Sequence, residues 1–164
     1  MNDEKGQLSG EYMLLVGSLI VVLMISIFMI ANENELNIAM AAAKSGADEG
    51  VASSSSAIYP KETFNEYDDM EGLKHPYSVS IVNVSYNSSG IDKNYGKQKI
   101  QFKVYAKASA DYNKKELDSI GDRINYNLRK SVATSFNTTD STNKLYNPVF
   151  SNNYVFTTAN VVWV

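Results

Sequence analysis

The sequence predicts an α+β protein in which a long apolar N-terminal α-helix, the stem, precedes a small globular head. Residues 12–31 read YMLLVGSLIVVLMISIFMIA and carry no charge. As a helix of about 30 Å they are long enough to cross the hydrocarbon core of a bilayer. Residues 77–86 and 98–110 alternate apolar and polar side chains as strands do, the first only in part, and residues 113–132 repeat apolar side chains at helical spacing. Averages over all 164 residues, with a net charge of −3, conceal this division.

One helix is expected to continue beyond the apolar segment, because no proline occurs before Pro60. From Leu36 onward the apolar residues recur every three or four positions, which indicates one buried face. Two rows of small residues follow this half of the helix: Ala39, Ala43 and Ala47, and Ala42, Gly46 and Gly50. Small side chains let another surface approach closely. We therefore expect the head to pack on this half, which ends near the serines at 53–56.

The head is expected to be a small sheet of antiparallel strands with one packed helix, and its first part to supply two of these strands. Residues 77–86 predict a strand with a bulge near Ile81 and Val82, which would turn two sets of apolar side chains toward the core. Those side chains are Val79, Ile81, Val82, Val84 and Tyr86. A hairpin loop at 87–97 leads to a strand at 98–110. The side chains that this second strand directs inward are Ile100, Phe102, Val104, Ala106 and Ala108.

One packed helix and two apolar runs are expected in the second part of the head. The apolar side chains of this helix recur every three or four residues: Leu117, Ile120, Ile124, Leu128 and Val132. Asn113 and Glu116 have the spacing of an N-cap and its capping partner, and residues 137–139 end the helix. Pro148 confines the run 145–150 to a sheet edge. The run 154–164 is expected to be a packed strand.

Composition disfavours most classes of enzyme. The chain has no cysteine, which excludes disulfides, thiolate zinc sites and cysteine nucleophiles, and its one histidine, His75, disfavours histidine metal clusters and catalytic triads. No phosphate-binding, dinucleotide-binding or zinc-protease motif occurs. Five acidic residues at 60–76 lack EF-hand spacing and are interpreted as a solvated loop, with calcium binding as the alternative. We expect no catalysis, no metal, no cofactor and no nucleic-acid partner.

The residues before the apolar segment narrow the choice of N-terminal signal. A secretory signal peptide would carry a basic flank and a shorter apolar region. A plain transmembrane anchor fits the length but leaves the order Lys5-Gly6, then Gln7-Leu8-Ser9-Gly10-Glu11-Tyr12, unexplained. A carboxylate at the mouth of an apolar helix is costly to bury unless it is paired. Cleavage between Gly6 and Gln7 would place Glu11 near a new positively charged amine. The alternative is that Glu11 is a solvated residue at a membrane edge.

The leader ending in Lys5-Gly6, the Gln-x-Ser-x-Glu-Tyr motif that begins at Gln7 and the apolar helix resemble an archaeal type IV pilin precursor with a class III signal peptide. The resemblance implies that a prepilin peptidase removes a leader at 1–6 by cutting between Gly6 and Gln7. It implies a helical stem at 7–59, whose residues 12–31 serve as membrane span and then as filament core, and a head domain at 60–164. It also implies that Glu11 pairs with the N-terminal amine of a neighbouring subunit during assembly.

The same resemblance implies a structural subunit of an adhesion pilus, a helical homo-oligomer built with a pilus assembly ATPase and a membrane platform. The precursor would lie in the cell membrane, and the mature subunit would belong to an extracellular pilus on the cell surface. Two alternatives remain open. One is a minor pilin or pseudopilin-like component, and the other is a membrane-anchored external binding domain that does not polymerise.

Three Asn-x-Ser/Thr sequons lie in the head, at Asn83, Asn87 and Asn137. None has proline in its middle position, and all three asparagines are expected to point outward, two from a strand and one beyond a helix end. The stem would place the head on the external side of the membrane. We therefore predict N-linked glycans at these positions.

Overall fold

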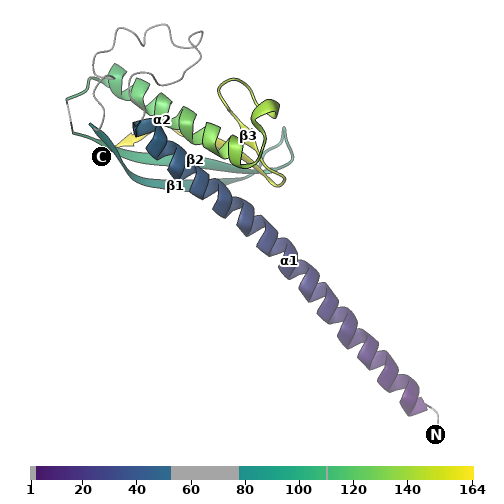
Figure 1. Cartoon of the computed structure of the whole chain (residues 1–164). Helices are drawn as coiled ribbons and strands as arrows, with labels where there is room; N and C mark the ends of the chain where they lie inside the picture. Colours follow the sequence, from purple (N-terminus) through teal and green to yellow (C-terminus); the bar gives the residue numbers. More distant parts are fainter. Residues whose placement is uncertain (1–2, 53–77, 110) are drawn as a thin grey trace. The chain divides into compact units, whose positions relative to one another are not determined.

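The computed structural model describes residues 3–52, 78–109 and 111–164, with side chains from residue 10 onward (Figure 1). The acidic segment at 60–76, His75, the serines at 53–56 and Pro60 lie outside the described residues. The contacts divide the chain into two compact units, residues 1–36 and 37–164, so that helix α1 (Asp3–Ala52) contributes to both. The predicted α+β fold, a long apolar helix with a small head that contains a sheet and a second helix, is confirmed.

The described residues of the head form a five-stranded mixed sheet. Its strands are β1 (Val79–Ile91), β2 (Gln98–Ala108), β3 (Val149–Phe150), β4 (Tyr154–Thr158) and β5 (Val162–Trp163). The strand order is β1-β2-β4-β3, and β5 also pairs with β2. Pairs β1–β2 and β3–β4 are antiparallel as expected, whereas β4 and β5 run parallel to β2. The parallel pairs arise because helix α2 (Lys114–Ser135) carries the chain back along the sheet between β2 and β4, as a crossover connection does.

The β1–β2 hairpin contains the predicted bulge, as a register shift between Ile81 and Asn83. Val79 and Val84 are buried, but Val82 is 58% exposed and Tyr86 is 45% exposed, so the expectation that both would enter the core is not met. Val82 is the unpaired residue at the bulge. Tyr86 lies opposite the buried Phe102, but β1 is an edge strand and leaves much of the tyrosine uncovered.

Strand β2 and helix α2 form largely as the sequence predicts. The predicted inward residues of β2 are buried up to Ala106, and Ala108 is half-buried. At the start of α2 the Asn113 side chain accepts a hydrogen bond from the Glu116 backbone N–H, and the Glu116 carboxylate accepts one from the Asn113 N–H, both at 2.9 Å. This reciprocal capping box satisfies two backbone donors that the first turn leaves unpaired. The α2 residues Ile120, Ile124, Leu128 and Val132 are all buried.

The C-terminal run is split into two short strands that follow one another along β2. Between them the Ala159 N–H donates to the Phe102 carbonyl at 2.8 Å, and after β5 the Val164 N–H donates to the Ala106 carbonyl at 2.9 Å. Phe156 of β4 stacks on Phe102 of β2 and on Phe136 after α2, with ring centroids 5.6 and 5.7 Å apart. Strand β3 forms the sheet edge, as Pro148 predicts.

The small residues in the second half of α1 bring this helix into close contact with α2. Ala39, Ala43 and Ala47 are fully buried. A Cβ atom at Gly46 would lie 2.6 Å from the Asn127 carbonyl oxygen and 2.8 Å from the Leu128 Cα atom. Gly50 makes an equally close approach to the backbone of α2. The expected role of this half of α1, as the element on which the head packs, is confirmed.

Replacing Gly46 by alanine should destabilise the head, although alanine is the better helix former. The added methyl group meets backbone atoms that can yield only if the two helices separate, and such overpacking costs about 1–3 kcal/mol. Thermal unfolding of the full chain in detergent, followed by circular dichroism, measures the change. Ser45→Ala, at an exposed neighbouring position, is the matched control and should change the free energy of unfolding by less than about 0.5 kcal/mol. A Gly46→Ala variant as stable as the control would contradict the close packing.

Candidate functional site

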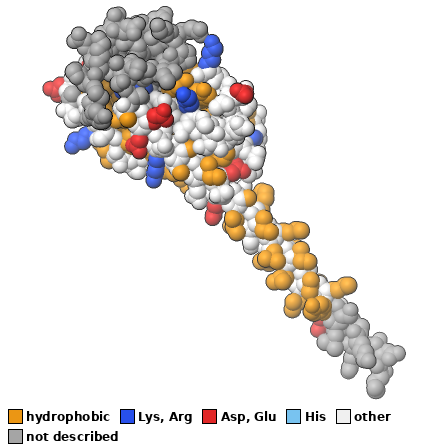
Figure 2. Space-filling view, in the orientation of Figure 1, with side chains coloured by type: hydrophobic (Ala, Val, Ile, Leu, Met, Phe, Trp, Pro, Cys, Tyr) orange, Lys and Arg blue, Asp and Glu red, His pale blue; other side chains and the backbone are white. Residues whose placement is uncertain are grey.

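One candidate functional surface lies on α1, where most of the apolar side chains from Tyr12 to Ile30 are exposed. Leu14 is 76% exposed, and Met24 and Ile30 are each 66% exposed. Figure 2 shows these side chains as an apolar surface along the helix. We call this region the stem surface. It is formed by Tyr12, Met13, Leu14, Leu15, Leu19, Ile20, Val21, Val22, Leu23, Met24, Ile25, Ile27, Phe28, Met29 and Ile30.

The few polar groups within the stem surface are satisfied by the helix itself. The Ser18 hydroxyl donates to the Leu15 carbonyl and the Ser26 hydroxyl to the Val22 carbonyl, each at 2.8 Å. A helix that is apolar on all sides is stable only when apolar groups surround it. By length and composition this helix can cross a membrane. Lipid tails and other apolar helices are the two environments that would cover it.

Glu11 marks the N-terminal border of the stem surface. Its side chain is exposed, directly before Tyr12. Within the described part of the chain it makes no ion pair. Gly6 and Gln7 lie in the first turns of α1, and cleavage between them stays a prediction, as does the pairing of Glu11 with an amine.

The three sequon asparagines are all exposed, as expected. Asn83 and Asn87 lie on β1, opposite Tyr105 and Gln101 of β2. Asn137 follows α2 with a backbone φ of 53°, in the left-handed region that asparagine tolerates better than most residues. All three side chains are placed where a glycosyltransferase could reach them. Their glycosylation stays a prediction.

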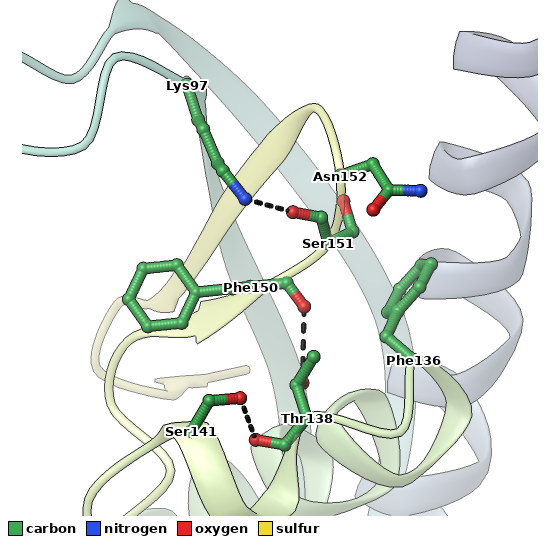
Figure 3. A pocket seen from close by; sticks show the side chains of 7 residues that line it. All are labelled: Lys97, Phe136, Thr138, Ser141, Phe150, Ser151 and Asn152. Atoms are coloured by element: carbon green, nitrogen blue, oxygen red, sulfur yellow. Dashed lines mark hydrogen bonds between the residues drawn. The ribbon is translucent and has the colours of Figure 1, made fainter.

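A pocket beside β3 contains several polar groups whose hydrogen bonds are made within the protein (Figure 3). The Lys97 ammonium donates to the Ser151 carbonyl at 2.5 Å, and the Thr138 hydroxyl donates to the Phe150 carbonyl at 3.2 Å. The Ser141 hydroxyl donates to the Thr138 carbonyl at 3.1 Å. The Thr138 bond joins β3 to the segment that follows α2, and the Lys97 bond joins the residue after β3 to the loop between β1 and β2. The pocket is thus explained by the packing of the head.

A second hollow, the C-terminal groove, was not anticipated from the sequence. One face of α2 lines it together with the last residues of the chain, and the lining residues are Lys114, Leu117, Asp118, Gly121, Asp122, Asn125, Asn160, Val161 and Trp163. The helical spacing of the first six was visible in the sequence. The approach of residues 160–163 was not, because it depends on the parallel pairing of β5 with β2.

No group of three or more histidine or acidic side chains that could hold a metal ion occurs among the residues described here. Comparison with protein-family models, with curated proteins and with solved structures found no match to the chain. The candidate sites therefore rest on the chemistry and geometry of this chain alone.

If the exposed sequons carry glycans, intact-mass spectrometry of the protein from its native cell should show a mass above that of the polypeptide. Asn83→Gln and Asn87→Gln should each remove one glycan mass. Asn94→Gln is the control, because Asn94 is also exposed but is followed by Tyr95 and Gly96 and forms no sequon. A native mass equal to that of the unmodified polypeptide would contradict glycosylation.

Proposed function

We propose that this protein is the precursor of a pilin, the structural subunit of an archaeal type IV-like adhesion pilus. The observation that carries the proposal is the stem surface, a continuous apolar helix that follows Gly6, Gln7 and Glu11 in the order of a class III signal peptide. In the precursor this surface would lie in the membrane. In the filament the same surface would lie against the stems of neighbouring subunits.

The energetics of the stem surface support polymerisation. Burying one large apolar side chain contributes about 1.5–3 kcal/mol, and more than a dozen such side chains are exposed here. In the membrane, lipid tails cover these side chains. Once the subunit leaves the bilayer, only other apolar helices can do so. The uninterrupted backbone hydrogen bonding of α1 suits both environments, because neither offers water to unpaired peptide groups.

In this proposal Glu11 sets the register between neighbouring stems. After cleavage between Gly6 and Gln7, the new N-terminal ammonium and the Glu11 carboxylate would both lie at the start of an apolar helix. A charge buried among apolar helices requires an opposite charge nearby. Pairing of Glu11 in one subunit with the amine of a neighbour would fix how far one stem slides along the next. The helix dipole also favours a carboxylate in the first turns.

The head would form the outer surface of the filament. Its exposed sequons and its abundant tyrosine, serine and asparagine suit a polar external surface. We propose prepilin peptidase, a pilus assembly ATPase and a membrane platform as the partners that process and assemble the subunit, and the cell surface as its final location.

Mass spectrometry of the N-terminus tests the proposed processing. The chain from filaments or membranes of the native cell should begin at Gln7, since the peptidase removes residues 1–6. A chain that still begins at Met1 in peptidase-competent cells would indicate a membrane-anchored domain. A chain cut near Ala41 would indicate a secretory signal peptide. Either result overturns the proposal.

Glu11→Gln tests the assembly step separately from cleavage. The variant keeps the shape of the side chain but removes its charge, so cleavage should proceed while filament yield falls at least tenfold, as counted by electron microscopy. Glu33→Gln is the matched control, because Glu33 is exposed beyond the C-terminal end of the stem surface, and it should assemble normally. Normal filaments from Glu11→Gln would remove the pairing argument. Sparse immunogold labelling of wild-type filaments would indicate a minor pilin.

A further inference from the structure

We propose that the C-terminal groove of the head binds a neutral saccharide. The proposal concerns the head alone, so it does not depend on polymerisation of the stem. The groove has a volume of about 330 Å³, within the range of small-molecule sites. Its wall on one side is a single face of α2, and on the other side it is the segment 160–163.

The apolar part of the groove includes the ring of Trp163. This residue is half-buried, and its Cζ2 atom lies 4.0 Å from the position of a Cβ atom at Gly121, so the ring packs against α2 beside the groove. Leu117 and Val161 add further apolar lining. A pyranose ring presents C–H groups on one face, and such a face packs well on an indole ring. The groove is mainly polar, and Trp163, Leu117 and Val161 give it a smaller apolar part against which the C–H groups of a sugar would pack.

The polar part of the groove offers planar hydrogen-bonding groups. Asp118, Asp122, Asn125 and Asn160 all line it. Asn125 is only 5% exposed, and its amide N–H donates to the Ala159 carbonyl at 2.9 Å, which fixes the side chain. Its Oδ1 atom is buried and accepts no hydrogen bond from the residues described. A buried acceptor without a donor costs free energy, and a ligand hydroxyl group would supply that donor.

The charges in the groove favour a neutral ligand over an ion. Lys114 stands in the groove with Asp118 and Asp122. An anion such as a phosphate would be repelled by the two carboxylates. A metal ion would find only these two carboxylates, because the residues described here hold no group of three or more acidic or histidine ligands. Burial raises the pKa of Asp122, Arg129 lowers it, and Asp118 raises it further. Hydroxyl groups can donate to these carboxylates and accept from Lys114, so a saccharide satisfies both signs at once.

The lone tryptophan of the chain makes the proposal directly measurable, because Trp163 is the only indole that fluoresces. The full chain in a detergent without a sugar headgroup is titrated with glucose, galactose, mannose, N-acetylglucosamine and their disaccharides. At least one should change the emission saturably, with a Kd on the order of 1 mM, and should protect Trp163 from quenching by acrylamide. Asn160→Ala and Asp122→Ala should weaken that binding at least tenfold.

Asp140→Ala is the matched control, because Asp140 is an exposed acid on the 3₁₀ helix η3 (Thr139–Ser141), away from the groove lining. It should leave the Kd unchanged. The proposal is overturned if no saccharide of the panel alters emission or quenching at about 50 mM, well above the expected Kd. It is also overturned if Ca²⁺ alone gives the saturable change, or if Asp140→Ala weakens binding as much as Asn160→Ala. Filament formation has no part in this readout, so the saccharide proposal is tested independently of the proposed pilus function.

Discussion

The close contact between the second half of α1 and α2 is the constraint on which the head depends. Gly46 and Gly50 have no side chain because the backbone of α2 occupies the space where a Cβ atom would lie. That contact holds α2 on one side, while the aromatic stack of Phe102, Phe156 and Phe136 holds the sheet and the end of α2 on the other. The groove residues on α2 belong to the same helix, so the packing that stabilises the head also fixes one wall of the C-terminal groove.

Local patterns in the sequence were sufficient for much of this fold. The capping box at Asn113 and Glu116 needs only two side chains three residues apart, and the alternation of β2 needs only one buried face. The rows of small residues on α1 predicted that another element packs closely against this helix, but they did not indicate which element. Pro148 predicted that β3 lies at a sheet edge, where the structure has it. In each case the cause lies within a few residues of its effect, which is why the residues themselves reveal it.

Features that depend on segments far apart in the sequence could not be predicted from local patterns. The parallel pairing of β4 and β5 with β2 follows from the path of the chain after α2, which no local spacing encodes. The exposure of Tyr86 follows from the position of β1 at the sheet edge. The C-terminal groove joins α2 to residues 160–163, and its members share no motif. By contrast, the apolar stem, Glu11 and the sequons were all found from the sequence, because each is a local chemical pattern.

Strand β2 pairs with other strands along both of its edges, and these partners become available at different times during synthesis. Strand β1 precedes β2 and is available as soon as the hairpin emerges, whereas β4 and β5 follow only after α2 and the β3 turn. Until then one edge of β2 has no partner, and its inward residues Phe102 and Val104 lack part of their cover. Non-local closure of this kind is slow. The stem helix is synthesised long before that closure, so the apolar segment meets its surroundings while the head is still incomplete.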